Sequence, residues 1–244
     1  MLLGGLQRHS LIDYPGKISC VCFITGCNFR CPYCHNPDLV RGRRVTPQPL
    51  DEGALSEFLE RRKGFLEGVV ISGGEPTLER GLAPLCRKIK RLGYSIKMDT
   101  NGSRPWVIKS LIDEGLVDYI AMDIKTELTL YPWFTQGKCS ADTIHSSIQI
   151  IMESGLDYEF RTTCVRPIVD NRTVENIARL IQGARTFALQ QFHNVEILQP
   201  EYFRGFKAGY DDDEMMRLKS AAEPFVRACV VRQSLTSADY LKAA

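Results

Sequence analysis

Short β-type runs alternate with amphipathic helical segments along most of this chain, and that alternation restricts the folds open to it. Between two of the runs, Leu78, Leu82, Leu85, Ile89 and Leu92 recur at steps of four and three residues, which predicts a helix with one apolar face. Strands connected by helices lie parallel, with right-handed crossovers. Six strand–helix units favour an α/β fold, a partial (β/α)6 barrel, and a doubly wound sheet is the alternative that periodicity leaves open. The predicted strands are 17–24, 67–72, 94–99, 118–124, 157–165 and 194–199.

Capping residues and apolar spacing predict where individual helices lie. Ser103 is a candidate N-cap for a helix that has Pro105 in its first turn. A later helix, whose apolar face runs from Ile177 to Ala184, separates the last two predicted strands. A final helix over about 211–222 is followed by a segment that can add one more strand.

Length and composition indicate one large domain. The 244 residues are 44% apolar and 25% charged, and a net charge of +2 is too small to indicate a nucleic acid or a membrane surface. No apolar run approaches the roughly 20 residues that cross a bilayer, and the first residues do not resemble a signal peptide. We therefore expect a cytoplasmic protein with a single domain over 1–244, its core at about 17–200 and a closing segment at about 201–244.

Three of the nine cysteines stand close together, directly after the first predicted strand. Cys27, Cys31 and Cys34 are separated by three and two residues, a spacing that lets one loop bring three thiolates to one metal centre. Iron–sulfur clusters usually take four cysteine ligands, so three thiolates leave one iron open for a reactant. A zinc site completed by His35 is an alternative, although neighbours such as Cys34 and His35 seldom close a relaxed tetrahedron. Unligated core thiols are the other alternative.

Glycine-rich and polar segments lie at the ends of the next three predicted strands. They are Gly-Gly-Glu-Pro at 73–76, Asp-Thr-Asn-Gly at 99–102 and Asp-Ile-Lys at 123–125, each of which is also ordinary turn chemistry. Glycines let a backbone approach a ligand closely, and Glu75 can accept hydrogen bonds from an ammonium group. Because these segments and the cysteine loop all fall at carboxyl ends of successive strands, where β/α barrels carry active sites, we predict one shared site.

The cysteine loop resembles the signature of the radical S-adenosylmethionine (radical SAM) superfamily. Members carry Cys-x-x-x-Cys-x-aromatic-Cys near the amino terminus, and Tyr33 fills the aromatic position here. The resemblance implies that the three cysteines bind one 4Fe–4S cluster, whose open iron chelates the methionine part of S-adenosylmethionine (SAM). It implies further that the reduced cluster cleaves SAM to a 5′-deoxyadenosyl radical, with Tyr33 packed beside the adenine.

Activating enzymes for glycyl-radical proteins, such as the pyruvate formate-lyase activator, carry similar Asp-Thr-Asn-Gly and Asp-x-Lys segments. By that resemblance Lys125 contacts SAM, while Asp99, Thr100 and Asp123 line a site for a monovalent cation. Arg161 is a looser match for a SAM-contacting arginine, and a buried salt bridge is an equal reading of it. The full set of expected cofactor-binding residues is Tyr33, His35, Gly73, Gly74, Glu75, Asp99, Thr100, Asp123, Lys125 and Arg161.

The resemblance departs from the pattern at the last predicted strand. Activators of this type often place a histidine near that point to contact the nucleotide. Here Gln199 or Glu201 stands instead, and His193 lies at the opposite end of the predicted strand. The sequence does not indicate which residue near Gln199 or Glu201 makes this contact with the nucleotide.

Two flanking strings narrow the resemblance further. The segments at 11–17 (LIDYPGK) and 33–40 (YCHNPDLV) are similar to activating proteins of anaerobic ribonucleoside-triphosphate reductase, in their longer variety. The implied reaction removes a hydrogen from a backbone glycine of a partner glycyl-radical enzyme, with a flavodoxin- or ferredoxin-type protein as electron donor. No cysteine lies between Cys34 and Gly73, so the ligands of a ferredoxin-like insert are missing and one cluster is expected.

Other functions are less consistent with these strings. Activation of a different glycyl-radical enzyme, of the pyruvate formate-lyase type, is the nearest alternative. A small-molecule enzyme like 7-carboxy-7-deazaguanine synthase often has a tryptophan before the third cysteine and lacks the Cys-His-Asn-Pro string. A non-enzymatic iron–sulfur carrier would have four cysteine ligands and no use for the strand-end segments.

Overall fold

The computed structural model describes residues 2–45, 50–193 and 196–233. Within them, eight strands form one sheet in the order β10-β9-β8-β7-β6-β5-β3-β2. The predicted α/β fold is confirmed, because every neighbouring pair except β2–β3 is parallel. The parallel strands are β3 (Ser19–Ile24), β5 (Gly68–Gly73), β6 (Ser95–Thr100), β7 (Tyr119–Asp123), β8 (Asp157–Cys164), β9 (Phe187–Gln191) and β10 (Cys229–Gln233).

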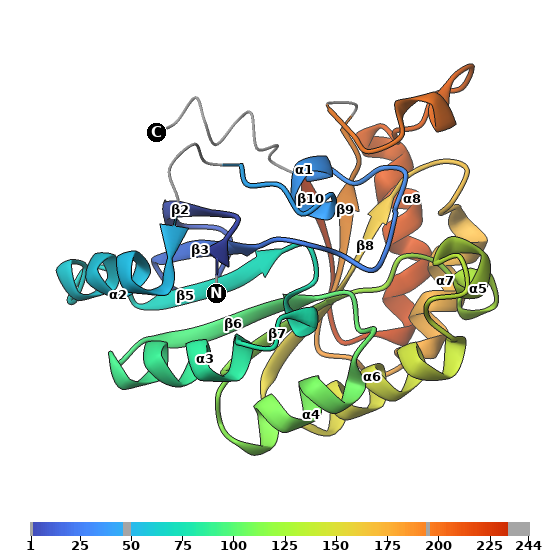
Figure 1. Cartoon of the computed structure of the whole chain (residues 1–244). Helices are drawn as coiled ribbons and strands as arrows, with labels where there is room; N and C mark the ends of the chain where they lie inside the picture. Colours follow the sequence, from blue (N-terminus) through green and yellow to red (C-terminus); the bar gives the residue numbers. More distant parts are fainter. Residues whose placement is uncertain (1, 46–49, 194–195, 234–244) are drawn as a thin grey trace.

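Helices follow the parallel strands, and α2, α3, α4 and α6 lie along one side of the sheet (Figure 1). The predicted apolar face of α3 is confirmed, since Leu82, Leu85 and Ile89 are all buried. The longer helices are α2 (Glu52–Arg61), α3 (Leu82–Arg91), α4 (Pro105–Asp113), α6 (Ala141–Glu153), α7 (Asn171–Leu180) and α8 (Asp212–Ala222). The shorter elements are β1 (Leu2–Leu3), β4 (Leu50–Asp51), α1 (Pro37–Val40), α5 (Tyr131–Phe134), η1 (Pro76–Leu78), η2 (Leu128–Leu130), η3 (Pro200–Phe203) and η4 (Glu223–Phe225).

An antiparallel strand that periodicity does not predict, β2 (Gly5–Ser10), closes one edge of the sheet beside β3. Its Arg8 and His9 are exposed, so it shows no apolar alternation. Hydrogen bonds to β3, rather than burial of its side chains, hold this segment extended. The loop that joins β2 to β3 contains the LIDYPGK string at 11–17.

The prediction of a strand at 194–199 is wrong. Residues 196–199 form no strand, 194–195 lie outside the described residues, and the strand is instead β9 at 187–191. Phe187, Ala188 and Leu189 are fully buried, and β9 pairs with both β8 and β10. Periodicity does not predict this strand, because so short an apolar run cannot be distinguished from a continuation of the preceding helix. That helix, α7, accordingly ends at Leu180, before Ala184.

The predicted N-cap at Ser103 is also wrong. Helix α4 begins at Pro105 with Arg104 at the N-cap position, and no side chain caps it. The Ser103 hydroxyl instead accepts a hydrogen bond from Asn28 Nδ2 at 2.9 Å, which ties the start of α4 to the cysteine loop.

The organisation as a single domain over 1–244 stays a prediction. Within the closing segment, α8 and β10 are described, and 234–244 lie outside the described residues. In the part of the chain that the structure describes, no helix is both long and apolar enough to cross a membrane.

Candidate active site at the carboxyl ends of the strands

A cavity of about 680 Å³ extends along the inner face of the sheet, from the cysteine loop to the loop between β2 and β3. The three cysteines line it, and so do nearly all the residues that the sequence places at the cofactors. Those residues are Tyr33, His35, Gly73, Gly74, Asp99, Thr100, Asp123, Lys125 and Arg161. The strand-end segments therefore meet in one place, as parallel strands require, and Glu75 is the exception.

Cys31 is buried, Cys27 and Cys34 are half-buried, and all three thiols lie near the positively charged Lys125 side chain. Burial raises the pKa of the Cys27 thiol to about 11 and that of Cys31 to about 12, and it raises the pKa of Cys34 as well, while the Lys125 ammonium opposes the rise at all three. The backbone N–H of Phe29 donates to Cys27 Sγ at 3.4 Å. The Lys125 ammonium and the Phe29 N–H both stabilise negative charge on sulfur, as thiolate ligands of a metal require.

The arrangement suits a cluster better than a single zinc ion. Among the described residues, no three Cys, His, Asp or Glu side chains are placed to hold one metal ion. His35 lies against Phe192 with ring centroids 5.5 Å apart, and its Nε2 is 3.1 Å from the His193 carbonyl oxygen. Burial lowers the pKa of His35. Three thiols on one loop that line a common cavity, each with a cation nearby, fit a cluster whose irons take separate thiolates.

The two glycines of the Gly-Gly-Glu-Pro segment permit close contact between loops. Gly73 has a φ of +118°, and a Cβ there would overlap the backbone of Ile24. A Cβ on Gly74 would overlap the carbonyl group of Gly26. The Gly74 N–H donates to the Ile24 carbonyl at 2.8 Å, so the segment is fastened to the start of the cysteine loop.

Glu75 does not face the cavity, and the structure corrects its expected role as an acceptor for a SAM ammonium group. Its side chain is fully buried, and its carboxylate accepts hydrogen bonds from Thr77, from Thr100 Oγ1 at 2.8 Å and from the Asn101 N–H at 2.6 Å. Burial raises the pKa of Glu75, although these hydrogen bonds oppose the rise. Glu75 thus joins the turn after β5 to the turn after β6.

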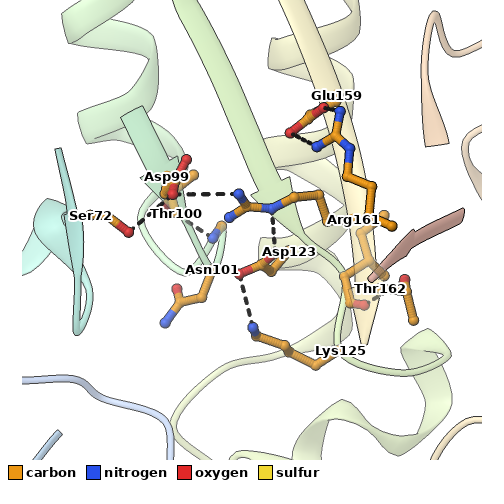
Figure 2. A network of polar contacts seen from close by, with 12 residues as sticks. Ser72, Asp99, Thr100, Asn101, Asp123, Lys125, Glu159, Arg161 and Thr162 are labelled. Carbon is orange, nitrogen blue, oxygen red and sulfur yellow. Dashed lines mark hydrogen bonds and ion pairs between the residues drawn. The ribbon is translucent and has the colours of Figure 1, made fainter. Parts of the chain in front are cut away.

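Ion pairs connect the ends of β6, β7 and β8 (Figure 2). Arg161 lies between two carboxylates, with Nε 2.8 Å from Asp123 Oδ1 and a guanidinium nitrogen 3.4 Å from Asp99 Oδ2. Lys97 Nζ is 2.5 Å from Asp99, and Lys125 Nζ is 3.0 Å from Asp123. Burial alone would raise the pKa of both carboxyls, but these cations outweigh it and hold both pKa values below their ordinary range. The salt-bridge reading of Arg161 is therefore the observed one.

The expected monovalent cation does not fit this arrangement. Three protein cations already surround Asp99 and Asp123, so a further cation would meet strong repulsion. The Thr100 hydroxyl is already occupied, because it donates to Glu75 and accepts from the Gly102 N–H.

Lys97, Glu159 and Thr163 line the cavity but are not predicted from the sequence, although a signal for them exists. Lys97 and Asp99 stand two apart on β6, and Glu159, Arg161 and Thr163 stand two apart on β8, so each set shares one face of its strand. Charged residues at alternate positions of a buried parallel strand are the signal of a polar interior. The cavity contains one further ion pair of this kind, in which a guanidinium nitrogen of Arg232, on β10, lies 2.7 Å from a carboxylate oxygen of Glu159.

The histidine expected near the sixth strand has no direct replacement at Gln199 or Glu201. Neither residue lines the cavity, whereas Gln190 of β9 does. The backbone N–H groups of Leu198 and Gln199 donate to the carbonyls of Cys34 and Pro32, both at 3.0 Å. The segment at 198–199 therefore holds the cysteine loop in place through backbone hydrogen bonds and not through its side chains.

Comparison with known proteins decides the family of this site. The family model described as the Radical SAM superfamily matches residues 21–182, which include the cysteine loop and strands β5 to β8. The chain belongs to the radical SAM superfamily. This family implies a 4Fe–4S cluster and SAM, and the cysteines, backbone donors and Lys125 of the cavity suit those groups.

The relatives of this radical SAM chain include activating enzymes. A protein of Methanocaldococcus jannaschii named as a glycyl-radical enzyme activating enzyme is 33% identical over 238 residues, which are 95% of each chain. The pyruvate formate-lyase-activating enzyme of Clostridium pasteurianum is 28% identical over 79% of this chain and 82% of its own. The chain is thus a radical SAM enzyme of the glycyl-radical-activating type.

Solved structures confirm the fold. QueE from Escherichia coli covers 96% of this chain and 93% of its own, with a TM-score of 0.58 and 14% identity. Methylornithine synthase (PylB) covers 86% of this chain and 70% of its own, with a TM-score of 0.60 and 14% identity. At these identities the likeness concerns the radical SAM fold alone.

Proposed function

We propose that this radical SAM enzyme abstracts a hydrogen from a backbone glycine of anaerobic ribonucleoside-triphosphate reductase. The strings at 11–17 and 33–40 support that partner, and the activating-enzyme relatives support a glycyl-radical enzyme in general. The observation that carries the proposal is a single cavity in which three thiols of one loop face ion pairs that neutralise one another. A flavodoxin- or ferredoxin-type protein is the proposed electron donor.

In this proposal Cys27, Cys31 and Cys34 hold the cluster. A reduced 4Fe–4S cluster would supply the electron that cleaves the sulfonium of SAM. Lys125 is placed to bind the anionic end of SAM, because its ammonium is near the thiols and its backbone N–H is fixed by the Tyr131 hydroxyl at 2.9 Å. The ring of Tyr33 packs beside the adenine.

Charge pairing in the cavity favours a segment of polypeptide over a small carboxylate as substrate. Among the described residues that line the cavity, each lysine and arginine is already paired with a carboxylate. These cations are Lys97, Lys125, Arg161 and Arg232. Lys125 serves SAM in this proposal, so a substrate carboxylate would have to displace the partner of Lys97, Arg161 or Arg232 and leave that partner without its cation, which is strongly unfavourable. A backbone glycine brings no charge and requires no such exchange.

The test is formation of a glycyl radical. Protein reconstituted with iron and sulfide under anaerobic conditions would be reduced and mixed with SAM and anaerobic ribonucleoside-triphosphate reductase. We expect the doublet electron paramagnetic resonance signal of a glycyl radical, and no signal with the Cys31→Ala variant. Parallel mixtures contain pyruvate formate-lyase or the substrate of 7-carboxy-7-deazaguanine synthase. A signal with pyruvate formate-lyase alone would change the partner, and turnover of the small molecule without any glycyl radical would refute the proposal.

A further inference from the structure

We propose that the side-chain amide of Asn101 raises the reduction potential of the cluster by donating a hydrogen bond to the Cys27 sulfur. Asn101 Nδ2 lies 3.8 Å from Cys27 Sγ, within the longer reach of sulfur acceptors. This inference rests on the proposal that Cys27, Cys31 and Cys34 hold the cluster. Asn101 acts through Cys27, so it is a positioning residue.

Hydrogen bonds on both sides of the amide fix which atom faces the sulfur. Asn101 Oδ1 accepts from the Ser103 N–H at 2.9 Å, and Nδ2 donates to Asn28 Oδ1 at 3.0 Å. Asn28 is itself oriented, because its Nδ2 donates to Ser103 Oγ at 2.9 Å. Rotating the Asn101 amide by half a turn would place oxygen against oxygen at Asn28 and forfeit the bond from Ser103. The second N–H of Nδ2 is therefore directed at Cys27.

The backbone that carries this amide is held just as firmly. The Asn101 N–H donates to Glu75 Oε2 at 2.6 Å, and the preceding Thr100 hydroxyl donates to the other oxygen of that carboxylate at 2.8 Å. Asn101 is only 5% exposed, so water competes little for its amide. In such a site a hydrogen bond is electrostatically stronger than in water. This assigns a purpose to the buried Glu75, which positions the Asn101 amide and does not touch the cavity.

The effect on the cluster follows from charge. Reduction adds an electron to a cluster whose sulfurs already carry negative charge, and a hydrogen bond to a thiolate stabilises the more negative state. Hydrogen bonds to the sulfurs are among the factors that set iron–sulfur potentials. Removing the Asn101 donor must make the cluster harder to reduce, and the same electron is needed before SAM can be cleaved.

The experiment measures the midpoint potential of the reconstituted cluster without SAM, by spectroelectrochemical titration. Asn101→Ala removes the donor. Asn101→Asp also removes it but keeps an oxygen that accepts the Ser103 N–H, so the turn is preserved. We expect the equilibrium constant for reduction to fall about tenfold in Asn101→Ala, which is about 59 mV for a one-electron couple, and at least as far in Asn101→Asp. Ser103→Ala is the matched control, because it loses the Asn28 contact but keeps the backbone N–H that orients Asn101.

An unchanged potential in Asn101→Asp with a full complement of iron would overturn the inference. An equal fall in Ser103→Ala would also overturn it, since the position of the loop and not the amide would then set the potential. So would failure of both Asn101 variants to hold a cluster, because the contact would then serve assembly. The ligand set is checked separately by Cys27→Ala, which must lose the cluster. If it keeps the cluster, the proposed ligand set fails, whatever the Asn101 variants show.

Discussion

Two buried regions of the same cavity use polar groups in opposite ways. At the cysteine loop, the thiols have raised pKa values and the Tyr33 hydroxyl has no hydrogen-bond partner among the described residues. On the inner face of the sheet, Asp99, Asp123 and Arg161 are joined to one another and to two lysines. The loop keeps groups available for ligands, whereas the sheet satisfies its charges internally and fixes the geometry of the site.

The largest effect is expected at the cysteine loop. Cys31→Ala removes one proposed ligand, so we expect loss of the cluster and of all SAM cleavage, measured as iron content and as 5′-deoxyadenosine formed. Cys86→Ala is the matched control, because Cys86 is fully buried on α3 and does not line the cavity. Wild-type protein should bind about four irons per chain, as one 4Fe–4S cluster requires; about eight would contradict the single cluster.

Breaking the sheet network should have a large effect on folding instead. Arg161→Met leaves Asp99 and Asp123 without their shared cation, and we expect the free energy of unfolding to fall by about 3–5 kcal/mol in urea titrations. Lys109→Met is the comparison, because Lys109 and Asp113 pair on the surface with side chains 59% and 57% exposed. That exposed pair should contribute only about 0–1 kcal/mol. A similar fall in the free energy of unfolding for both variants would show that the buried ion pairs of Arg161 contribute no more to stability than an exposed pair does.

An intermediate effect is expected at Glu75, which links the two regions. In Glu75→Gln one carboxylate oxygen becomes an NH₂ group, so at least one of the donors from Thr77, Thr100 or Asn101 loses its acceptor. We expect the free energy of unfolding to fall by about 1–3 kcal/mol. Glu57→Gln, on the exposed face of α2, is the control. A loss no larger than that of the control would mean that the Glu75 carboxylate does not hold the turns together.

Lowering the pH should weaken the ion pairs that Asp123 makes with Arg161 and Lys125. Despite burial, which acts the other way, Arg161 and Lys125 hold the pKa of Asp123 below its ordinary 3.8 in the folded state. The unfolded chain therefore takes up this proton first as pH falls, so the stability that Asp123 contributes is complete above about pH 3.8 and is lost below it. The difference in melting temperature between wild type and Asp123→Asn should shrink as pH falls from 5 to 3. A constant difference would contradict this assignment.

The smallest effect concerns monovalent ions. Because protein cations already neutralise Asp99 and Asp123, we expect SAM cleavage to be the same in sodium, potassium and tetramethylammonium buffers of equal ionic strength. A rate that depends on sodium or potassium would show that an ion enters the network and that Arg161 moves to admit it.

Most strand positions, the apolar face of α3 and the α/β class were predictable, because they follow from periodicity over a few neighbouring residues. The failures lie where pairing between distant segments decides the structure. Residues 187–191 form strand β9 because they pair with β8 and β10 on either side. Residues 5–10 form strand β2 because they pair with β3 at the edge of the sheet. No local pattern in 187–191 or 5–10 contains that information.

By itself the sequence determined the three-cysteine loop, the strand-end segments around it and the resemblance that the family comparison confirmed. These are local properties, since ligand spacing and turn chemistry are written in consecutive residues. Only the tertiary structure decided that Glu75 faces the turn after β6, that Arg161 stands between Asp99 and Asp123, and that Asn101 reaches Cys27. Those contacts join residues up to 74 positions apart, and they depend on strand order and on which face of each strand a side chain occupies.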